Sequence, residues 1–101
     1  MAQRPTFMDE LRKCDPTFFE VVAAVSAKSQ EAGALDPKTK VLISLALDAA
    51  GSHPEGVRNL AARARAAGVK DEEIIETIRL VFMVAGIPGL VAGLAAFRDS
   101  G

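Results

Sequence analysis

The 101-residue chain is long enough for one small hydrophobic core, and half of its residues are hydrophobic. Its 12 basic and 13 acidic residues are scattered and give a net charge of −1, which argues against a nucleic-acid partner because phosphate contacts need a basic face. One cysteine, Cys14, and one histidine, His53, exclude an internal disulfide and do not support a metal site. We therefore expect no metal and no cofactor.

The N-terminal sequence MAQRPTFMDELRK contains no apolar segment of signal-peptide length, so we expect a reducing, cytoplasmic location. Residues 1–5 are expected to be disordered, and a short amphipathic helix is predicted around Phe7 to Lys13. Asp15 and Pro16 then give a typical helix start, an N-cap carboxylate followed by a proline that needs no N–H partner. Apolar residues at helical spacing extend this second helix to a predicted stop at Gly33.

Asp36 and Pro37 repeat the start signal and open a helix that is apolar on nearly all sides and should end near Gly51. A helix of this kind is expected at the centre of the fold. It carries one polar stripe, because four polar residues recur at intervals of four: Lys40, Ser44, Asp48 and Ser52. The stripe is either a solvated face or the wall of a cavity, in which Asp48 lies close to the end of the helix.

The next helix is predicted to begin with a capping box, in which Ser52 and Glu55 each accept a hydrogen bond from the other's backbone N–H, and to end at Gly68. Asp71 opens an acidic first turn that suits the dipole of a further helix.

No charged residue occurs from Leu80 to Phe97, a run of 18 residues that reaches the threshold length for a membrane span. The sequence Gly86-Ile87-Pro88 should break this run, so a buried helical hairpin is predicted instead and no membrane partner is expected. The remaining apolar surface indicates burial against another subunit. We predict an all-α fold of about five or six helices with a central antiparallel hairpin, in one domain over residues 1–101.

The segments LDPKTKVLISLALDAAG and ARAAGVKDEEIIETIRLVFMVAGIPGL, together with DPTFFE upstream, resemble the carboxymuconolactone decarboxylase family. Its superfamily also contains the AhpD-like alkylhydroperoxidases. The resemblance covers roughly Leu35 to Phe97. It implies an all-α AhpD-like fold that assembles with itself into trimers or hexamers.

The redox branch of that superfamily uses a C-x-x-C motif at the start of the helix after the central one, and the two cysteine positions fall here on Ser52 and Glu55. The partner histidine falls near Asn59 or Leu60, and the relay glutamate falls on Lys40 or Val41. Serine cannot form a disulfide, so thiol peroxidase chemistry of this kind is excluded. Cys14 lies between a basic and an acidic neighbour and gives no sign of thiolate activation.

The decarboxylase branch carries a segment rich in His and Glu at the same place, and SHPEGVRNL is similar to it through His53, Glu55 and Arg58. The final histidine of that segment is replaced here by Leu60. Histidine titrates near neutral pH, which makes His53 the candidate general acid or base. Asp48 or Glu55 could orient its imidazole, and Arg58 could bind a carboxylate of a substrate, with Ser52 beside it.

Two functional hypotheses remain. In the first, the protein is a non-redox lyase for a small lactone or carboxylic acid, with catalytic His53, Glu55 and Asp48 and substrate-binding Arg58 and Ser52. In the second, it is a non-catalytic oligomer that serves as a binding or scaffold module. A solvated loop position for His53 and a purely structural role for Glu55 would fit the second hypothesis.

Overall fold

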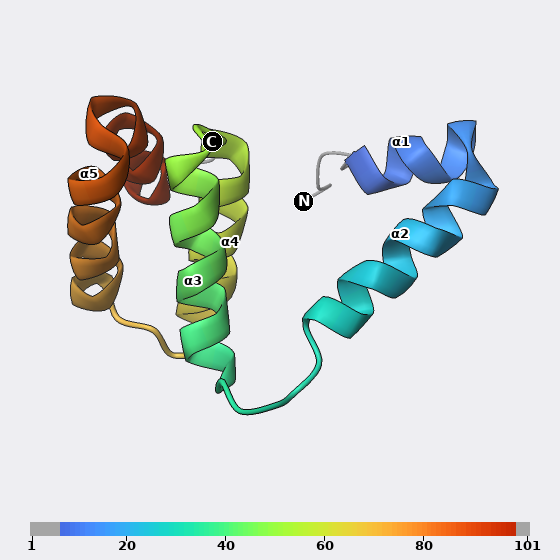
Figure 1. Cartoon of the computed structure of the whole chain (residues 1–101), viewed down its shortest axis with the longest axis horizontal. Coiled ribbons are helices and arrows are strands. Elements are labelled where there is room, and N and C mark those ends of the chain that lie inside the picture. The colour runs from blue at the N-terminus through green and yellow to red at the C-terminus, as the bar shows by residue number, and fades with distance from the viewer. Residues whose placement is uncertain (1–6, 99–101) are drawn as a thin grey trace. The chain divides into compact units, whose positions relative to one another are not determined.

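The computed structural model describes residues 7–98, which form five α-helices and one 3₁₀-helix with no strand among them (Figure 1). The predicted all-α fold is confirmed. The contacts of the chain divide it into two compact units, residues 1–32 and residues 33–101. A single domain over the whole chain stays a prediction, and the expectation for residues 1–5 lies outside the described residues.

The first unit consists of α1, Phe7–Cys14, and α2, Pro16–Ser29, which meet at a corner around Asp15 (Figure 1). Asp15 caps α2 as predicted, because its Oδ1 accepts a hydrogen bond of 3.1 Å from the backbone N–H of Phe18. The predicted stop at Gly33 is wrong. The helix ends four residues earlier, since the N–H of Gln30 turns inward to the carbonyls of Ser26 and Ala27 and closes the last turn. Neither α1 nor α2 buries a residue.

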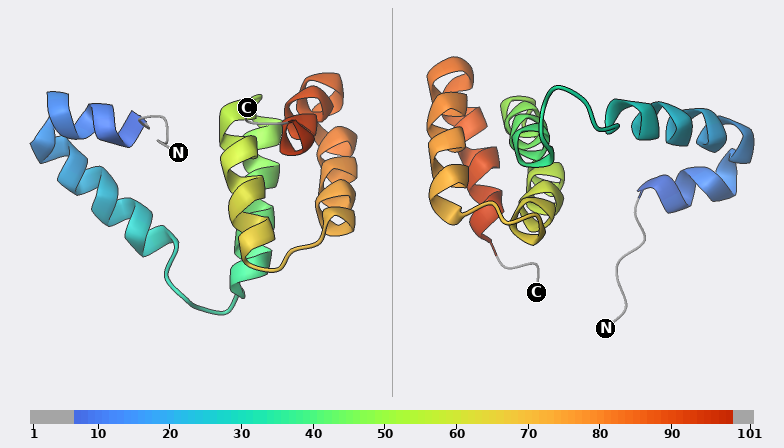
Figure 2. Two further views of the ribbon diagram at one scale, coloured as in Figure 1. Left: turned by 180° about the vertical axis from the view of Figure 1, so that it is seen from behind. Right: turned by 90° about the horizontal axis from the view of Figure 1, so that it is seen from below.

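The second unit contains α3, Pro37–Ala50; α4, Pro54–Ala66; α5, Asp71–Gly93; and η1, Leu94–Phe97. Helix α3 packs against both α4 and α5, as expected for a helix that is apolar on nearly all sides, and η1 packs against the same two (Figure 2). Small and β-branched side chains make the contacts close. The core cluster consists of Leu45, Ala49, Val57, Ala61, Ala64, Val69, Ile74, Ile78, Val81, Ala95 and Ala96.

Both ends of α3 lie where the sequence predicts them. Asp36 caps the first turn by accepting a 2.8 Å hydrogen bond from the N–H of Thr39, and this bond lowers the pKa of the Asp36 carboxyl. The helix ends at the predicted Gly51, which is its C-cap residue.

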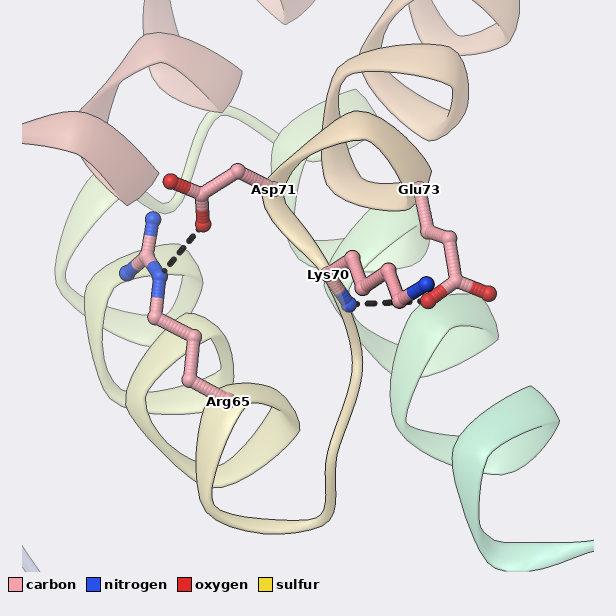
Figure 3. A network of polar contacts seen from close by, with 4 residues as sticks. All are labelled: Arg65, Lys70, Asp71 and Glu73. Atoms are coloured by element: carbon pink, nitrogen blue, oxygen red, sulfur yellow. Dashed lines mark hydrogen bonds and ion pairs between the residues drawn. The ribbon is translucent and has the colours of Figure 1, made fainter.

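The predicted capping box at Ser52 and Glu55 is wrong. The N-cap of α4 is His53, which makes no side-chain cap, because Ser52 has a φ of 62° and belongs to the turn that ends α3. A one-sided side-chain cap is found at α5 instead, where Oε1 of Glu73 accepts a 2.8 Å hydrogen bond from the backbone N–H of Lys70 (Figure 3). The acidic first turn predicted for this helix is confirmed.

By length and composition, Asp71–Phe97 could cross a membrane, with a mean hydropathy of 2.2 in its most apolar window and one third of that window buried. Such a helix is weak evidence for a span, and this one is not straight. Gly86 has a φ of 70° and a ψ of −157°, so the predicted break is confirmed. A Cβ at Gly93 would lie 3.1 Å from side-chain carbons of Ile78, which shows that the chain folds back.

The break leaves a first arm, residues 71–85 of α5, and a second arm, residues 87–97, which consists of the end of α5 and η1; we call them the two arms of α5. Each arm is shorter than the roughly 20 residues that a membrane-spanning helix needs. The two arms together with α3 and α4 enclose the core of this unit (Figure 2).

Candidate functional site

The end of α3 is closed by two backbone hydrogen bonds that together define a Schellman motif. The N–H of Ser52 donates to the carbonyl of Ala49 at 3.0 Å, and the N–H of His53 donates to the carbonyl of Asp48 at 2.9 Å. The motif requires a left-handed backbone at the residue directly after the C-cap. Ser52 is at this position and has a positive φ. As a result, the side chains of Asp48 and His53 are brought to the same side of the turn.

Asp48 and His53 form a pair at this corner. The Oδ1 atom of Asp48 lies 3.4 Å from Nδ1 of His53, and the two side chains are 35% and 67% exposed, respectively. A carboxylate beside Nδ1 favours the tautomer with a proton on that nitrogen and leaves Nε2 for proton transfer. The arrangement therefore has the parts of an acid–base dyad that is open to solvent.

Two glycines make room for the pair. A Cβ at Gly51 would lie 2.9 Å from Cε1 of His53, and a Cβ at Gly56 would overlap the carboxylate of Asp48. Gly56 lies in the first turn of α4, where most residues would make a better helix. The Asp48 carboxylate thus sits against the N-terminus of α4, where the helix dipole stabilises a negative charge.

The other predicted site residues have different surroundings. Nη1 of Arg58 lies 3.5 Å from Oε1 of Glu55, so these two residues pair with one another. The Arg58 side chain is 27% exposed, and its Nε is buried without a hydrogen-bond partner among the described residues. Ser52 contributes its left-handed backbone rather than a described side-chain contact.

The polar stripe of α3 is on the solvent side in its middle part. Ser44 is exposed, and its hydroxyl donates to the backbone carbonyl of Lys40 at 2.9 Å. A pocket of about 280 Å³ lies elsewhere in the second unit, and none of the stripe residues or the five predicted site residues lines it.

Sequence reasoning missed Gly56, the closeness of Gly51 to His53, and this pocket. Gly56 could have been singled out, because a glycine in the first turn of an otherwise good helix often marks a close approach. The closeness of Gly51 to the imidazole depends on the left-handed turn at Ser52, and no local sequence pattern predicted this turn.

Comparison with known proteins places the chain in a family. The model of the carboxymuconolactone decarboxylase family matches residues 16–99. Two solved structures are similar and each is 28% identical in sequence. A carboxymuconolactone decarboxylase family protein from Legionella pneumophila has a TM-score of 0.79 and is matched over 86% of this chain and 78% of its own.

A candidate carboxymuconolactone decarboxylase from Burkholderia xenovorans LB400 has a TM-score of 0.84 over 92% of this chain and 74% of its own. None of the curated proteins that were compared matches. The all-helical fold and the family model agree, and the chain belongs to the carboxymuconolactone decarboxylase family.

Proposed function

We propose that the protein is a non-redox lyase that acts on a small lactone bearing a carboxylate, with His53 as its general acid or base. The observation that carries this proposal is the Asp48–His53 pair, 3.4 Å apart and reachable from solvent. Ser52 and Glu55 stand where a redox relative would need cysteines, which leaves proton transfer as the chemistry available at this corner.

The reaction would be a decarboxylation. The bond between the substrate's carboxylate carbon and the adjacent carbon breaks. The carboxylate leaves as CO₂, and the electron pair of the bond remains on the adjacent carbon. Protonated His53 then delivers its Nε2 proton to the carbon and is reprotonated by solvent, while Asp48 stabilises the imidazolium. This direction of proton transfer makes His53 the acid of the step.

Arg58 is the proposed binding group for a second carboxylate or the lactone carbonyl of the substrate. Its guanidinium contacts Glu55 through Nη1 at the long distance of 3.5 Å; the buried Nε is out of reach, so the terminal N–H groups are the ones proposed to bind the substrate. Glu55 then positions Arg58 rather than the imidazole. The assignment differs from the catalytic role that the sequence suggested for Glu55.

The test is turnover of carboxymuconolactone, the lactone that gives the family its name, followed by CO₂ release. We expect His53→Ala to lower the rate about 100-fold or more, the usual contribution of a positioned acid or base. Asp48→Asn should reduce the rate less, and Arg58→Gln should act mainly on KM. Glu31→Gln, in the first unit, is the matched carboxylate control. Equal rates in the wild type and His53→Ala would remove His53 from the mechanism.

A second candidate function is that of a non-catalytic homo-oligomer acting as a binding module, and a surface on α5 favours it. Four apolar residues of α5 are between 62% and 80% exposed: Leu80, Met83 and Val84 at helical spacing on the first arm, and Ile87 directly after the break. We call them the outer stripe. A chain of this size rarely leaves such a row uncovered, so we propose that a second copy covers it in a trimer or hexamer.

Light scattering tests the oligomer directly, and Leu80→Asp together with Val84→Asp should give monomers. Oligomers without turnover of the lactone would favour the binding module over the lyase. We also propose the cytoplasm as the location, because Cys14 is a free and exposed thiol, the state that a reducing compartment maintains.

A further inference from the structure

The pocket of about 280 Å³ lies between the two arms of α5 and is walled almost entirely by carbon. Three apolar side chains come from each arm: Ile75, Ile78 and Phe82 from the first, and Leu90, Leu94 and Phe97 from the second. At roughly 30 Å³ for each water-sized group, this volume holds a ligand of about ten non-hydrogen atoms. The walls predict that most of these atoms are apolar.

One charged side chain, Arg79, is among the lining residues, and because the wall is almost entirely carbon, this exposed side chain faces the pocket chiefly through its aliphatic stem. Its guanidinium makes no ion pair or hydrogen bond with any residue from 7 to 98, whereas Arg58 and Arg65 each lie beside a carboxylate. The described lining contains no acidic side chain. An unpaired guanidinium at an apolar pocket favours a ligand that carries an anionic group on an apolar body.

The wall opposite the first arm is held in place. The Phe97 ring lies under the guanidinium of Arg65, with Cζ 5.3 Å from the ring centroid. Nε of Arg65 in turn donates a 2.9 Å hydrogen bond to Oδ1 of Asp71 (Figure 3). Because Asp71 neutralises Arg65, the charge that remains for a ligand belongs to Arg79.

The pocket and the outer stripe are on different faces of α5. On the first arm the pocket takes positions 75, 78 and 79 and the outer stripe takes 80, 83 and 84, so the second set repeats the first five residues later; Ile87 follows the break at Gly86. Five residues correspond to a rotation of about 140° around an α-helix. Burial of the outer stripe against a second copy therefore leaves the pocket face available.

We infer that this pocket binds a small apolar carboxylate, such as a medium-chain fatty acid, with the carboxylate on Arg79 and the chain between the two arms of α5. The site shares no residue with Asp48, His53 or Arg58, and the inference does not depend on the proposed lyase activity. The observation specific to it is the pairing of an unneutralised guanidinium with a carbon-lined pocket of matching size.

Octanoate, which has ten non-hydrogen atoms, is the probe, and octanol is its uncharged counterpart. We expect calorimetry on the full chain to show one octanoate per chain, bound at least tenfold more tightly than octanol. Arg79→Gln should remove that difference while octanol binding is unchanged. Arg63→Gln, an arginine of α4 outside the lining, is the matched control and should leave both affinities as in the wild type.

Leu94→Trp should fill the pocket and abolish binding of both probes. Circular dichroism of each variant checks that the fold is retained. Equal affinities for octanoate and octanol in the wild type, or no effect of Arg79→Gln, would overturn the inference.

Two further measurements distinguish octanoate from other occupants of the pocket. If octanoate binds only after Leu80→Asp and Val84→Asp produce monomers, a second copy covers the pocket and the inference is wrong. If the protein sediments with phosphatidylglycerol vesicles but binds no free octanoate, the arginine serves an anionic lipid surface, and the inference is wrong as well.

Discussion

The turns that end α3 and α4 have the same pattern of backbone hydrogen bonds, but their side chains differ in polarity and burial. At the end of α4, the N–H of Gly68 donates to Arg65 at 3.0 Å and the N–H of Val69 donates to Ala64 at 2.9 Å, the same two bonds that close α3. Gly68 has a φ of 95° where the other motif has Ser52 at 62°. The two turns are therefore a natural internal comparison.

In a Schellman motif, the residue directly after the left-handed position usually makes an apolar contact with the residue four positions before it. The end of α4 follows this rule with Ala64 and Val69, which are both buried in the core. The end of α3 has Asp48 and His53 at the same two places, and both are partly exposed. One turn contributes to stability, whereas the other holds a titratable pair where an apolar contact would normally lie.

The largest effect should come from giving the end of α4 the residues of the end of α3. Ala64→Asp with Val69→His places two polar groups in the core, and we expect a loss of about 3 kcal/mol or more in the free energy of unfolding. Urea denaturation measures it. Val69→Ala, which removes only apolar volume, should cost about 2 kcal/mol and keeps the comparison measurable if the double variant does not fold. A double variant as stable as the wild type would contradict the buried, apolar character of this end.

Substitutions at the two left-handed positions should have opposite signs. Gly68→Ala should lose about 1–2 kcal/mol, because alanine is strained at a φ of 95°. Ser52→Gly should gain about 0.5–1 kcal/mol by relieving the same strain. Thermal unfolding of both variants decides the point, and a loss at both positions would mean that the Ser52 side chain stabilises its turn.

The reverse transfer, Asp48→Ala with His53→Val, should change the free energy of unfolding by less than about 1 kcal/mol, because both side chains are partly exposed. Under the proposed function, the same variant should have no lyase activity. Denaturation and CO₂ release are measured on one preparation. A large loss of stability would show that the pair is structural.

The smallest effect concerns the start of α3. The pKa of Asp36 lies below its ordinary value of 3.8, chiefly because its carboxylate accepts a hydrogen bond from the N–H of Thr39. The stabilisation is therefore complete above pH 3.8 and is lost as the pH falls through the lower pKa of the folded state. Asp36→Asn should keep the cap but remove this part of the acid dependence, as measured by unfolding between pH 2 and pH 5. An unchanged pH profile would contradict the assigned cap.

Local signals in the sequence were sufficient for most of the fold. Asp15-Pro16 and Asp36-Pro37 predicted two helix starts, and Gly86 before a proline predicted the break in α5. The end of α2 at Ser29 was missed because a tightened last turn, and not the expected glycine, closes the helix. Capping patterns failed at Ser52 because the preceding helix determined its backbone.

Predicting the site was harder, since its geometry depends on contacts between helices. Asp48 and His53 could be singled out by position, but the space that Gly51 and Gly56 leave for them follows from the packing of α3 against α4. The Arg79 pocket exists only because the second arm of α5 folds back onto the first. A periodic stripe alone does not distinguish a core face from the wall of such a pocket.

The absence of any buried residue in α1 and α2 has a consequence for amide hydrogen exchange. Helices of 8 and 14 residues are marginal in water unless another surface covers their apolar side. Their backbone amides should thus exchange with deuterium quickly in a dilute, monomeric sample, while those of Leu45 and Ile74 exchange slowly. Slowing of exchange in residues 7–29 as the concentration rises would then report assembly at single-residue detail, before any particle size is measured.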